Sequence, residues 1–126
     1  MGVVYRAEQT AIKREVALKV LHANLNDESL FARFQNEAAA ASRLNHPNTI
    51  TIYDFGRTES DSLYIAMEFI KGTSLDDEIH ACGAMPVQRV CRLGTQICGS
   101  LQDAHDNSIV HRDLKPENVM LCERAG

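Results

Sequence analysis

His111-Arg112-Asp113-Leu114-Lys115-Pro116-Glu117-Asn118-Val119 is the most informative stretch of this 126-residue chain. A carboxylate at Asp113, an ammonium at Lys115 and a carboxamide at Asn118 follow one another at spacings of two and three residues. The proline and the apolar pairs on both sides predict a short loop between extended segments. A phosphoryl-transfer site needs such groups: one orients a hydroxyl, one meets phosphate charge and one holds a metal ion. Each residue alone would also suit a solvated turn, but the ordered run favours a catalytic loop.

A second informative stretch is Glu15-Val16-Ala17-Leu18-Lys19-Val20, which is apolar and rich in valine and therefore predicts a strand. By alternation, Ala17 and Lys19 share one face of that strand. A small residue beside a lysine suits a flat ring with phosphates lying beyond it. A lone lysine on a strand is otherwise most simply explained as facing solvent.

A long helix is predicted from Asp27 to Leu44, with acidic residues near its N-terminus. An apolar stripe runs along it at helical spacing: Leu30, Phe34, Ala41 and Leu44. Glu37 falls within this stripe, where a charge is costly unless it is paired, and Lys19 is the expected partner. The alternative is that Glu37 lies at the margin of the stripe and reaches water.

Composition narrows the classes of function. The formal charge is −4, from thirteen basic and seventeen acidic residues with interspersed signs, which argues against a nucleic-acid or membrane-surface binder. No apolar run reaches the roughly 18 residues of a membrane span, and no signal sequence opens the chain. No two of the four cysteines have the close Cys-x-x-Cys spacing in the sequence. We therefore expect reduced thiols in a cytoplasmic protein rather than a disulfide framework or a zinc site.

The order of the predicted elements is strands first and helices afterwards. Expected strands cover Val3–Glu8, Val16–Leu21, Thr49–Phe55 and Leu63–Phe69, with the long helix between the second and third. Ser74 and Asp77 are spaced as a capping box that begins a short helix, and Gly83 ends it. Pro86 is expected in the first turn of a second long helix.

Three segments together resemble the eukaryotic-type protein kinases. The stretch His111–Val119 resembles their catalytic loop, and Lys115 is typical of the serine/threonine class. The lysine-bearing strand resembles the one that contacts ATP phosphates, and Met67-Glu68-Phe69-Ile70 resembles the hinge. The resemblance implies an α+β, two-lobed kinase fold. Residues 1–70 would form the small lobe, an antiparallel sheet without its first strand plus one helix, and residues 71–126 the start of the helical large lobe.

The resemblance also implies roles in transferring the γ-phosphoryl group of ATP to serine or threonine hydroxyls of a protein substrate. Asp113 would orient the hydroxyl and accept its proton, Lys115 would meet the γ-phosphate, and Asn118 would hold Mg²⁺. Lys19 would contact the α- and β-phosphates, and Glu37 would orient Lys19.

The adenine contacts follow from the same resemblance. The Glu68 carbonyl and the Ile70 amide would meet the adenine edge. Val4 and Ala17 would cover one face of the ring and Met120 the other, with Met67 behind it. Each of these apolar residues, taken singly, is equally well explained as ordinary core.

Departures from the family pattern set a limit on this interpretation. Only Gly2 remains of the glycine-rich loop, and no aspartate follows Asp113, so the Asp-Phe-Gly aspartate is expected beyond residue 126. We therefore expect a truncated kinase domain that is inactive in isolation. Two alternatives stay open: a non-catalytic nucleotide-binding or interaction fragment, and a small-molecule kinase of the aminoglycoside type. The aminoglycoside-type enzymes usually carry glycine where this chain has Arg112, so the sequence argues against that second alternative.

Overall fold

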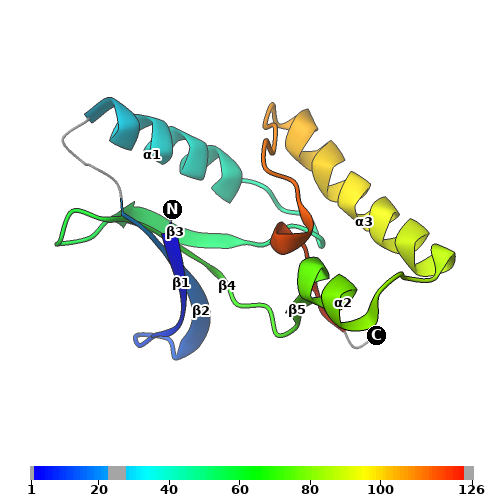
Figure 1. Ribbon diagram of the computed structural model, residues 1–126. Helices are drawn as coiled ribbons and strands as arrows, with labels where there is room; N and C mark the ends of the chain where they lie inside the picture. The colour runs from blue at the N-terminus through cyan, green and yellow to red at the C-terminus, as the bar shows by residue number, and fades with distance from the viewer. Residues whose placement is uncertain (1, 23–27, 124–126) are drawn as a thin grey trace. The chain divides into compact units, whose positions relative to one another are not determined.

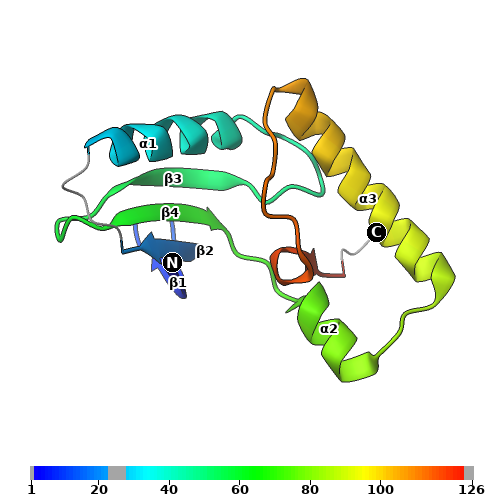
Figure 2. The same ribbon diagram turned by 45° about the horizontal axis from the view of Figure 1, so that its top comes forward.

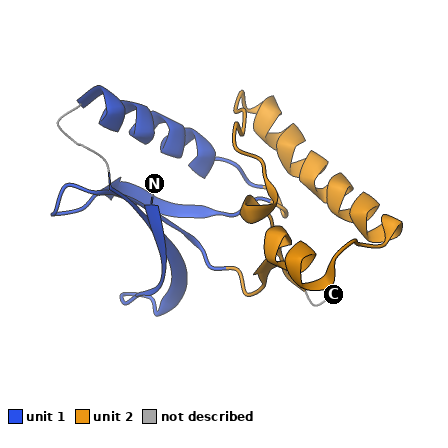
Figure 3. Ribbon diagram, viewed as in Figure 1, with its two compact units in different colours: residues 1–45, 49–69 blue, residues 46–48, 70–126 orange. Residues whose placement is uncertain are grey.

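The computed structural model describes residues 2–22 and 28–123, and the chain forms two compact units. Unit 1 comprises residues 1–45 and 49–69, and unit 2 comprises residues 46–48 and 70–126 (Figure 3). None of the helices within the described residues is both long and apolar enough to cross a membrane. The expected first residue of the long helix, Asp27, lies outside the described residues.

Unit 1 is an antiparallel sheet of four strands in the order β1-β2-β4-β3 (Figure 1). The strands are β1 (Gly2–Gln9), β2 (Arg14–Leu21), β3 (Ile52–Arg57) and β4 (Leu63–Glu68). All four strand predictions are confirmed, with ends shifted by up to three residues. The central strands β2 and β4 carry the most buried residues of the sheet, Val16 and Leu63, at 5% and 3% exposure.

Helix α1 (Glu28–Ser42) lies along β3, at the side of the sheet opposite β1 (Figure 2). The Arg57 guanidinium of β3 stacks 4.0 Å from the ring centroid of Phe31, and Ala38 is 5% exposed. The covered stripe therefore runs through Phe31, Phe34, Ala38 and Ala41, whereas Leu30 and Glu37 are exposed. Phe34 and Ala41 lie on the covered stripe as predicted, but Phe31 and Ala38 take the places expected for Leu30 and Glu37, so the expected burial of Glu37 is wrong.

Unit 2 contains α2 (Leu75–Cys82), α3 (Val87–Asp106), a 3₁₀ turn η1 (Pro116–Asn118), and the short strands β5 (Thr73–Ser74) and β6 (Met120–Leu121). The predicted cap of α2 is confirmed, because the Asp77 N–H donates to Ser74 Oγ at 3.0 Å and Gly83 ends the helix with φ 71°. Pro86 precedes α3 as its N-cap, so the expectation that it lies inside the first turn is wrong by one residue.

The pairing of β5 with β6 was not predicted, because two residues are too few to show a strand pattern. Thr73 lies opposite Leu121 and Ser74 opposite Met120. Gly72 permits this pairing, since a Cβ atom at position 72 would collide with the carbonyl oxygen of Leu121. The two-stranded sheet thus joins the segment before α2 to the segment after η1.

We predict that Gly72→Ala lowers the free energy of unfolding by about 1–3 kcal/mol, because the added methyl group meets backbone rather than a movable side chain. The matched control is Gly94→Ala in α3, where a Cβ atom has no neighbour within 4 Å. Because alanine favours the helix interior more than glycine does, Gly94→Ala should raise the free energy of unfolding by about 1 kcal/mol. Urea unfolding measures both changes. Equal stabilities of Gly72→Ala and the parent chain would contradict the assigned role of Gly72.

Candidate active site

The loop between α3 and β6 is anchored at both ends within unit 2. At its start, the Ile109 N–H donates to the Ala104 carbonyl at 2.8 Å as the chain leaves α3. At its end, the Leu75 N–H of α2 donates to the Val119 carbonyl at 2.7 Å, and β6 pairs with β5 directly afterwards. These anchors fix the ends of the segment that carries the predicted catalytic residues.

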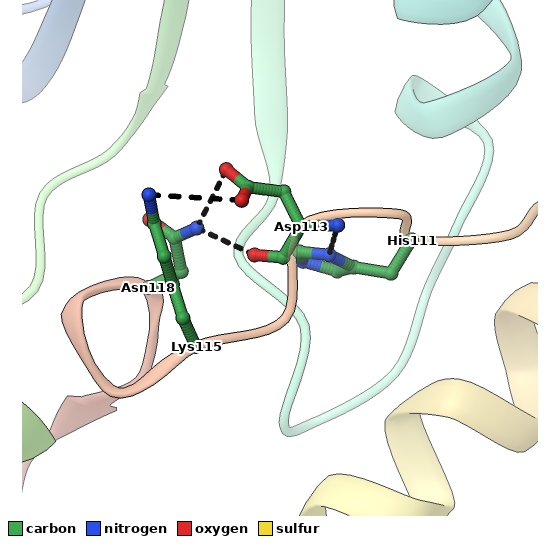
Figure 4. Close-up of polar contacts among 4 residues, drawn as sticks. All are labelled: His111, Asp113, Lys115 and Asn118. Atoms are coloured by element: carbon green, nitrogen blue, oxygen red, sulfur yellow. Dashed lines mark hydrogen bonds and ion pairs between the residues drawn. The ribbon is translucent and has the colours of Figure 1, made fainter.

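Asp113 is the centre of the polar contacts inside this loop (Figure 4). The Asn118 amide nitrogen donates to the Asp113 carbonyl at 2.8 Å and to its Oδ2 at 3.3 Å. Lys115 Nζ lies 3.6 Å from Asp113 Oδ1, and the Asp113 N–H donates to His111 Nδ1 at 3.2 Å. The structure therefore brings together the carboxylate, the ammonium and the carboxamide that the sequence predicted as one cluster.

Local backbone geometry explains how Asn118 returns to Asp113 across five residues. Arg112 has φ 68°, a left-handed conformation that is uncommon outside glycine, and it redirects the chain just before Asp113. Pro116 then opens η1, in which the Asn118 N–H donates to the Lys115 carbonyl at 2.9 Å. Left-handed residues of this kind gather at functional sites, where surrounding contacts hold them.

The exposure of the cluster leaves its reactive atoms accessible. The side chains of Asp113 and Lys115 are 68% and 49% exposed. An ion pair that is this exposed contributes little free energy, so Lys115 can leave Asp113 for a phosphate at small cost. Because the Asn118 amide nitrogen is bound to Asp113, its Oδ1 points elsewhere and has no hydrogen bond within the part of the chain that is described. An amide oxygen is a ligand that Mg²⁺ accepts, so the residue fits the predicted metal.

Four other predicted site residues share one face of the unit 1 sheet. Val4 lies opposite Lys19 in the β1–β2 register, and Met67 lies opposite Ala17 in the β2–β4 register. Residues directly opposite in an antiparallel pair point to the same face, as do residues two apart along a strand. The strand register thus places Val4 beside Lys19 although the two are fifteen positions apart.

Lys19 and Glu37 do not form an ion pair in this structure. No ion pair involving Lys19 is present across residues 2–22 and 28–123. Glu37 instead lines a cavity of about 250 Å³ in unit 1, together with Leu21, His22, Leu30, Arg33, Phe34 and Leu63. The predicted pair therefore stays a prediction for another state of the molecule.

The hinge-like residues lie where β4 ends. The Glu68 N–H donates to the Thr51 carbonyl at 2.8 Å, and the Glu68 carboxylate accepts the Thr51 N–H at 3.2 Å. Ile70 is partly buried, and Met120 of β6 is 37% exposed. The contact of the Glu68 side chain was not predicted, because the two residues are seventeen positions apart and no spacing rule links them.

Acidic groups surround His80 on α2, which contacts η1 within unit 2. The Nδ1–H of His80 donates to the Asp76 carbonyl at 2.8 Å, and this bond is the main reason why the pKa of His80 is raised. The carboxylates of Asp76, Asp77 and Glu117 raise the pKa further by favouring the charged ring. Glu117 belongs to the loop that carries Asp113, and its effect on the pKa of His80 is the smallest of these.

Comparison with known proteins identifies the class. Residues 1–126 match the protein kinase domain family over their whole length. The chain is 48% identical over 125 residues to the serine/threonine-protein kinase pkn3 of Myxococcus xanthus, a match that covers 98% of this chain and 23% of that relative. It is 42% identical over 122 residues to the serine/threonine-protein kinase PrkC of Bacillus subtilis, covering 96% of this chain and 19% of PrkC.

A solved structure agrees with these relatives. The crystal structure of the Mycobacterium tuberculosis PknI kinase domain matches with a TM-score of 0.84 and 33% identity, over 96% of this chain and 50% of that domain. The chain belongs to the protein kinase domain family. It spans about a fifth of the length of the curated relatives and half of the solved kinase domain. The predicted kinase fold, with the small lobe and the start of the large lobe, is confirmed.

We predict that the pKa of His80 in the folded chain lies above the ordinary value of 6.5 and falls in Asp76→Asn. The folded-state pKa is the higher one, so His80 stabilises the fold below its unfolded-state pKa, and this stabilisation is lost as pH rises through the folded-state pKa. An NMR titration of the ring protons measures both midpoints. Glu117→Gln should shift the midpoint less than Asp76→Asn. A midpoint at or below 6.5 in the parent chain would contradict this arrangement.

Proposed function

We propose that this chain carries the first half of a serine/threonine protein kinase domain, whose whole protein transfers the γ-phosphoryl group of ATP to protein hydroxyls. The observation that carries the proposal is the cluster of Asp113, Lys115 and Asn118, joined by contacts of 2.8–3.6 Å on a loop anchored at both ends. Membership of the kinase family supports the same reaction.

Asp113 orients the substrate hydroxyl and accepts its proton as the hydroxyl oxygen bonds to the γ-phosphorus. The bond from that phosphorus to the β–γ bridging oxygen breaks, and ADP leaves. Its carboxylate suits this task because it is exposed and because the Asn118 amide and the His111 ring hold the residue in place. Phosphoryl transfer requires little covalent chemistry from the protein, so this positioning accounts for a large part of the rate.

Lys115 and Asn118 stabilise the negative charge of the phosphate groups in the proposed reaction. Lys115 moves from Asp113 to the γ-phosphate when the nucleotide is present, which also frees the carboxylate for the hydroxyl. Asn118 Oδ1 would hold Mg²⁺, and a bound Mg²⁺ would supply positive charge beside the phosphate oxygens.

Unit 1 supplies further nucleotide contacts in this proposal. Lys19 contacts the α- and β-phosphates, while Val4, Ala17 and Met67 on the same sheet face contact the adenine. Ile70 and Met120 of unit 2 contribute the remaining adenine contacts. Glu37 stays the proposed partner of Lys19 in a nucleotide-bound state. Leu21, which lines the Glu37 cavity, lies two residues after Lys19 on the same face of β2, which supports that assignment.

A second candidate function is a non-catalytic nucleotide-binding or interaction fragment. It needs only the nucleotide contacts proposed for the sheet face of unit 1, where the strand register brings together Val4, Ala17, Lys19 and Met67. The two candidates differ in phosphate transfer and share nucleotide binding. For both we propose a reducing compartment such as the cytoplasm, because all four cysteines are free and exposed.

We predict that Mg-ATP stabilises the 126-residue chain and that Lys19→Met abolishes most of this effect. A ligand that binds only the folded state adds about 2.7 kcal/mol when its concentration is 100 times Kd. Thermal unfolding with increasing Mg-ATP measures the effect. The control is Arg92→Ala on α3, which also removes one positive charge and should keep the full shift. A shift that persists in Lys19→Met would place the nucleotide elsewhere.

We predict that a polypeptide of these 126 residues transfers no phosphate, and that a chimera completed with the rest of the Myxococcus xanthus kinase domain does. In the chimera, Asp113→Asn should lower turnover by about 10²- to 10⁴-fold with little change in ATP affinity, because it removes only the proton acceptor. Asp61→Asn, the same change in an exposed turn, is the control. Labelled ATP and a generic protein substrate suffice. Transfer by the 126-residue polypeptide that disappears in Asp113→Asn would contradict the predicted inactivity.

A further inference from the structure

We propose that the Glu68 carboxylate is a positioning residue for adenine recognition. By accepting the Thr51 N–H, it keeps the Glu68 carbonyl out of the β3–β4 ladder and available to the adenine amino group. This inference rests on the proposed function, because it concerns the way in which one strand end is prepared for the nucleotide.

The evidence is an incomplete hydrogen-bonded pair at the end of the sheet. The last pair in the β3–β4 register is Ile52 with Met67, so the next pair is Thr51 with Glu68. The Glu68 N–H donates to the Thr51 carbonyl at 2.8 Å, which is one half of a narrow antiparallel pair. The other half would be a bond from the Thr51 N–H to the Glu68 carbonyl. The Thr51 N–H instead donates to Glu68 Oε2 at 3.2 Å.

The direction of the Glu68 carbonyl follows from strand geometry. In a strand, the N–H and C=O of one residue point to the same neighbouring strand. The Glu68 N–H points to Thr51, so its carbonyl points to that side as well, away from Val16, its partner in the β2–β4 register. The ladder donor opposite this carbonyl is the Thr51 N–H, and that N–H donates to the Glu68 side chain instead.

Charge explains why the carboxylate is the better acceptor. A hydrogen bond to an ionised carboxylate is stronger than one to a neutral carbonyl, so Glu68 Oε2 competes well for the Thr51 N–H. A carbonyl that already accepts a ladder bond would have to share or lose it on accepting the amino group. A carbonyl that accepts no ladder bond before the nucleotide binds avoids this loss, which is the general advantage of preorganisation.

The experiment compares Glu68→Ala with Glu68→Gln in the full 126-residue chain. Alanine lets the Thr51 N–H return to the carbonyl at position 68, whereas glutamine keeps an oxygen at the same reach. Glu59→Ala, in the exposed turn between β3 and β4, is the control for lost charge. The ligands are adenosine and inosine, because inosine lacks the amino group that the carbonyl would accept. Titrations followed by NMR give the two Kd values for each variant.

We expect the parent chain, Glu68→Gln and Glu59→Ala to prefer adenosine over inosine. In Glu68→Ala the preference should fall by about 2- to 10-fold, the factor expected for one hydrogen bond. A merely structural role of Glu68 would weaken both nucleosides equally. An unchanged preference in Glu68→Ala would overturn the inference while leaving the proposed function intact. If the parent chain bound neither adenosine nor Mg-ATP, the proposed function would fail as well.

A measurement without nucleotide tests the hydrogen bond itself. Scalar coupling across hydrogen bonds should connect the Thr51 nitrogen to the side-chain carboxyl carbon of Glu68 in the parent chain. In Glu68→Ala it should connect that nitrogen to the backbone carbonyl carbon of residue 68. Coupling to the backbone carbonyl already in the parent chain would overturn the inference, whatever the nucleosides do.

Discussion

The hydrogen bonds from the Asn118 amide to Asp113 are the constraint on which the candidate site depends. They close a loop across five residues, at 2.8 Å to the carbonyl and 3.3 Å to the carboxylate, so the proposed base and metal ligand cannot move independently. They also decide which end of the amide faces Asp113 and therefore leave an oxygen for a cation. The left-handed Arg112, the turn η1 and the β5–β6 pair all serve to hold the two ends of this contact in place.

Each unit assembles its part of the site by a different physical means. In unit 1, the register of the strands places the site residues: antiparallel pairing sets Val4 opposite Lys19 and Ala17 opposite Met67. A slip of one residue in either pairing would move the paired side chains to different faces of the sheet. In unit 2, local backbone geometry places the site residues, since Asp113, Lys115 and Asn118 lie within a few residues of one another. Substitutions in β1 should therefore act through pairing, and substitutions in the loop should act through turn geometry.

The parts of the fold that could be predicted from the sequence are those with a periodic or local signal. The strands, the Ser74 cap and the Asp113–Asn118 cluster follow from alternation, capping chemistry and close spacing. In α1 the adjacent alanines 38–41 suit either face, so Glu37 was placed on the covered stripe where Ala38 lies, and its expected burial was wrong. The β5–β6 pair and the contact between Glu68 and Thr51 join segments distant in sequence, and no single-sequence pattern reports such contacts.

The φ of 68° at Arg112 limits which residues evolution can place there. Most side chains occupy that conformation at a cost, β-branched ones most of all, whereas glycine occupies it freely. Loss of the whole side chain is thus an easier substitution at this position than exchange for valine or isoleucine. A glycine at position 112 would therefore keep the loop backbone unchanged while it removes the arginine side chain.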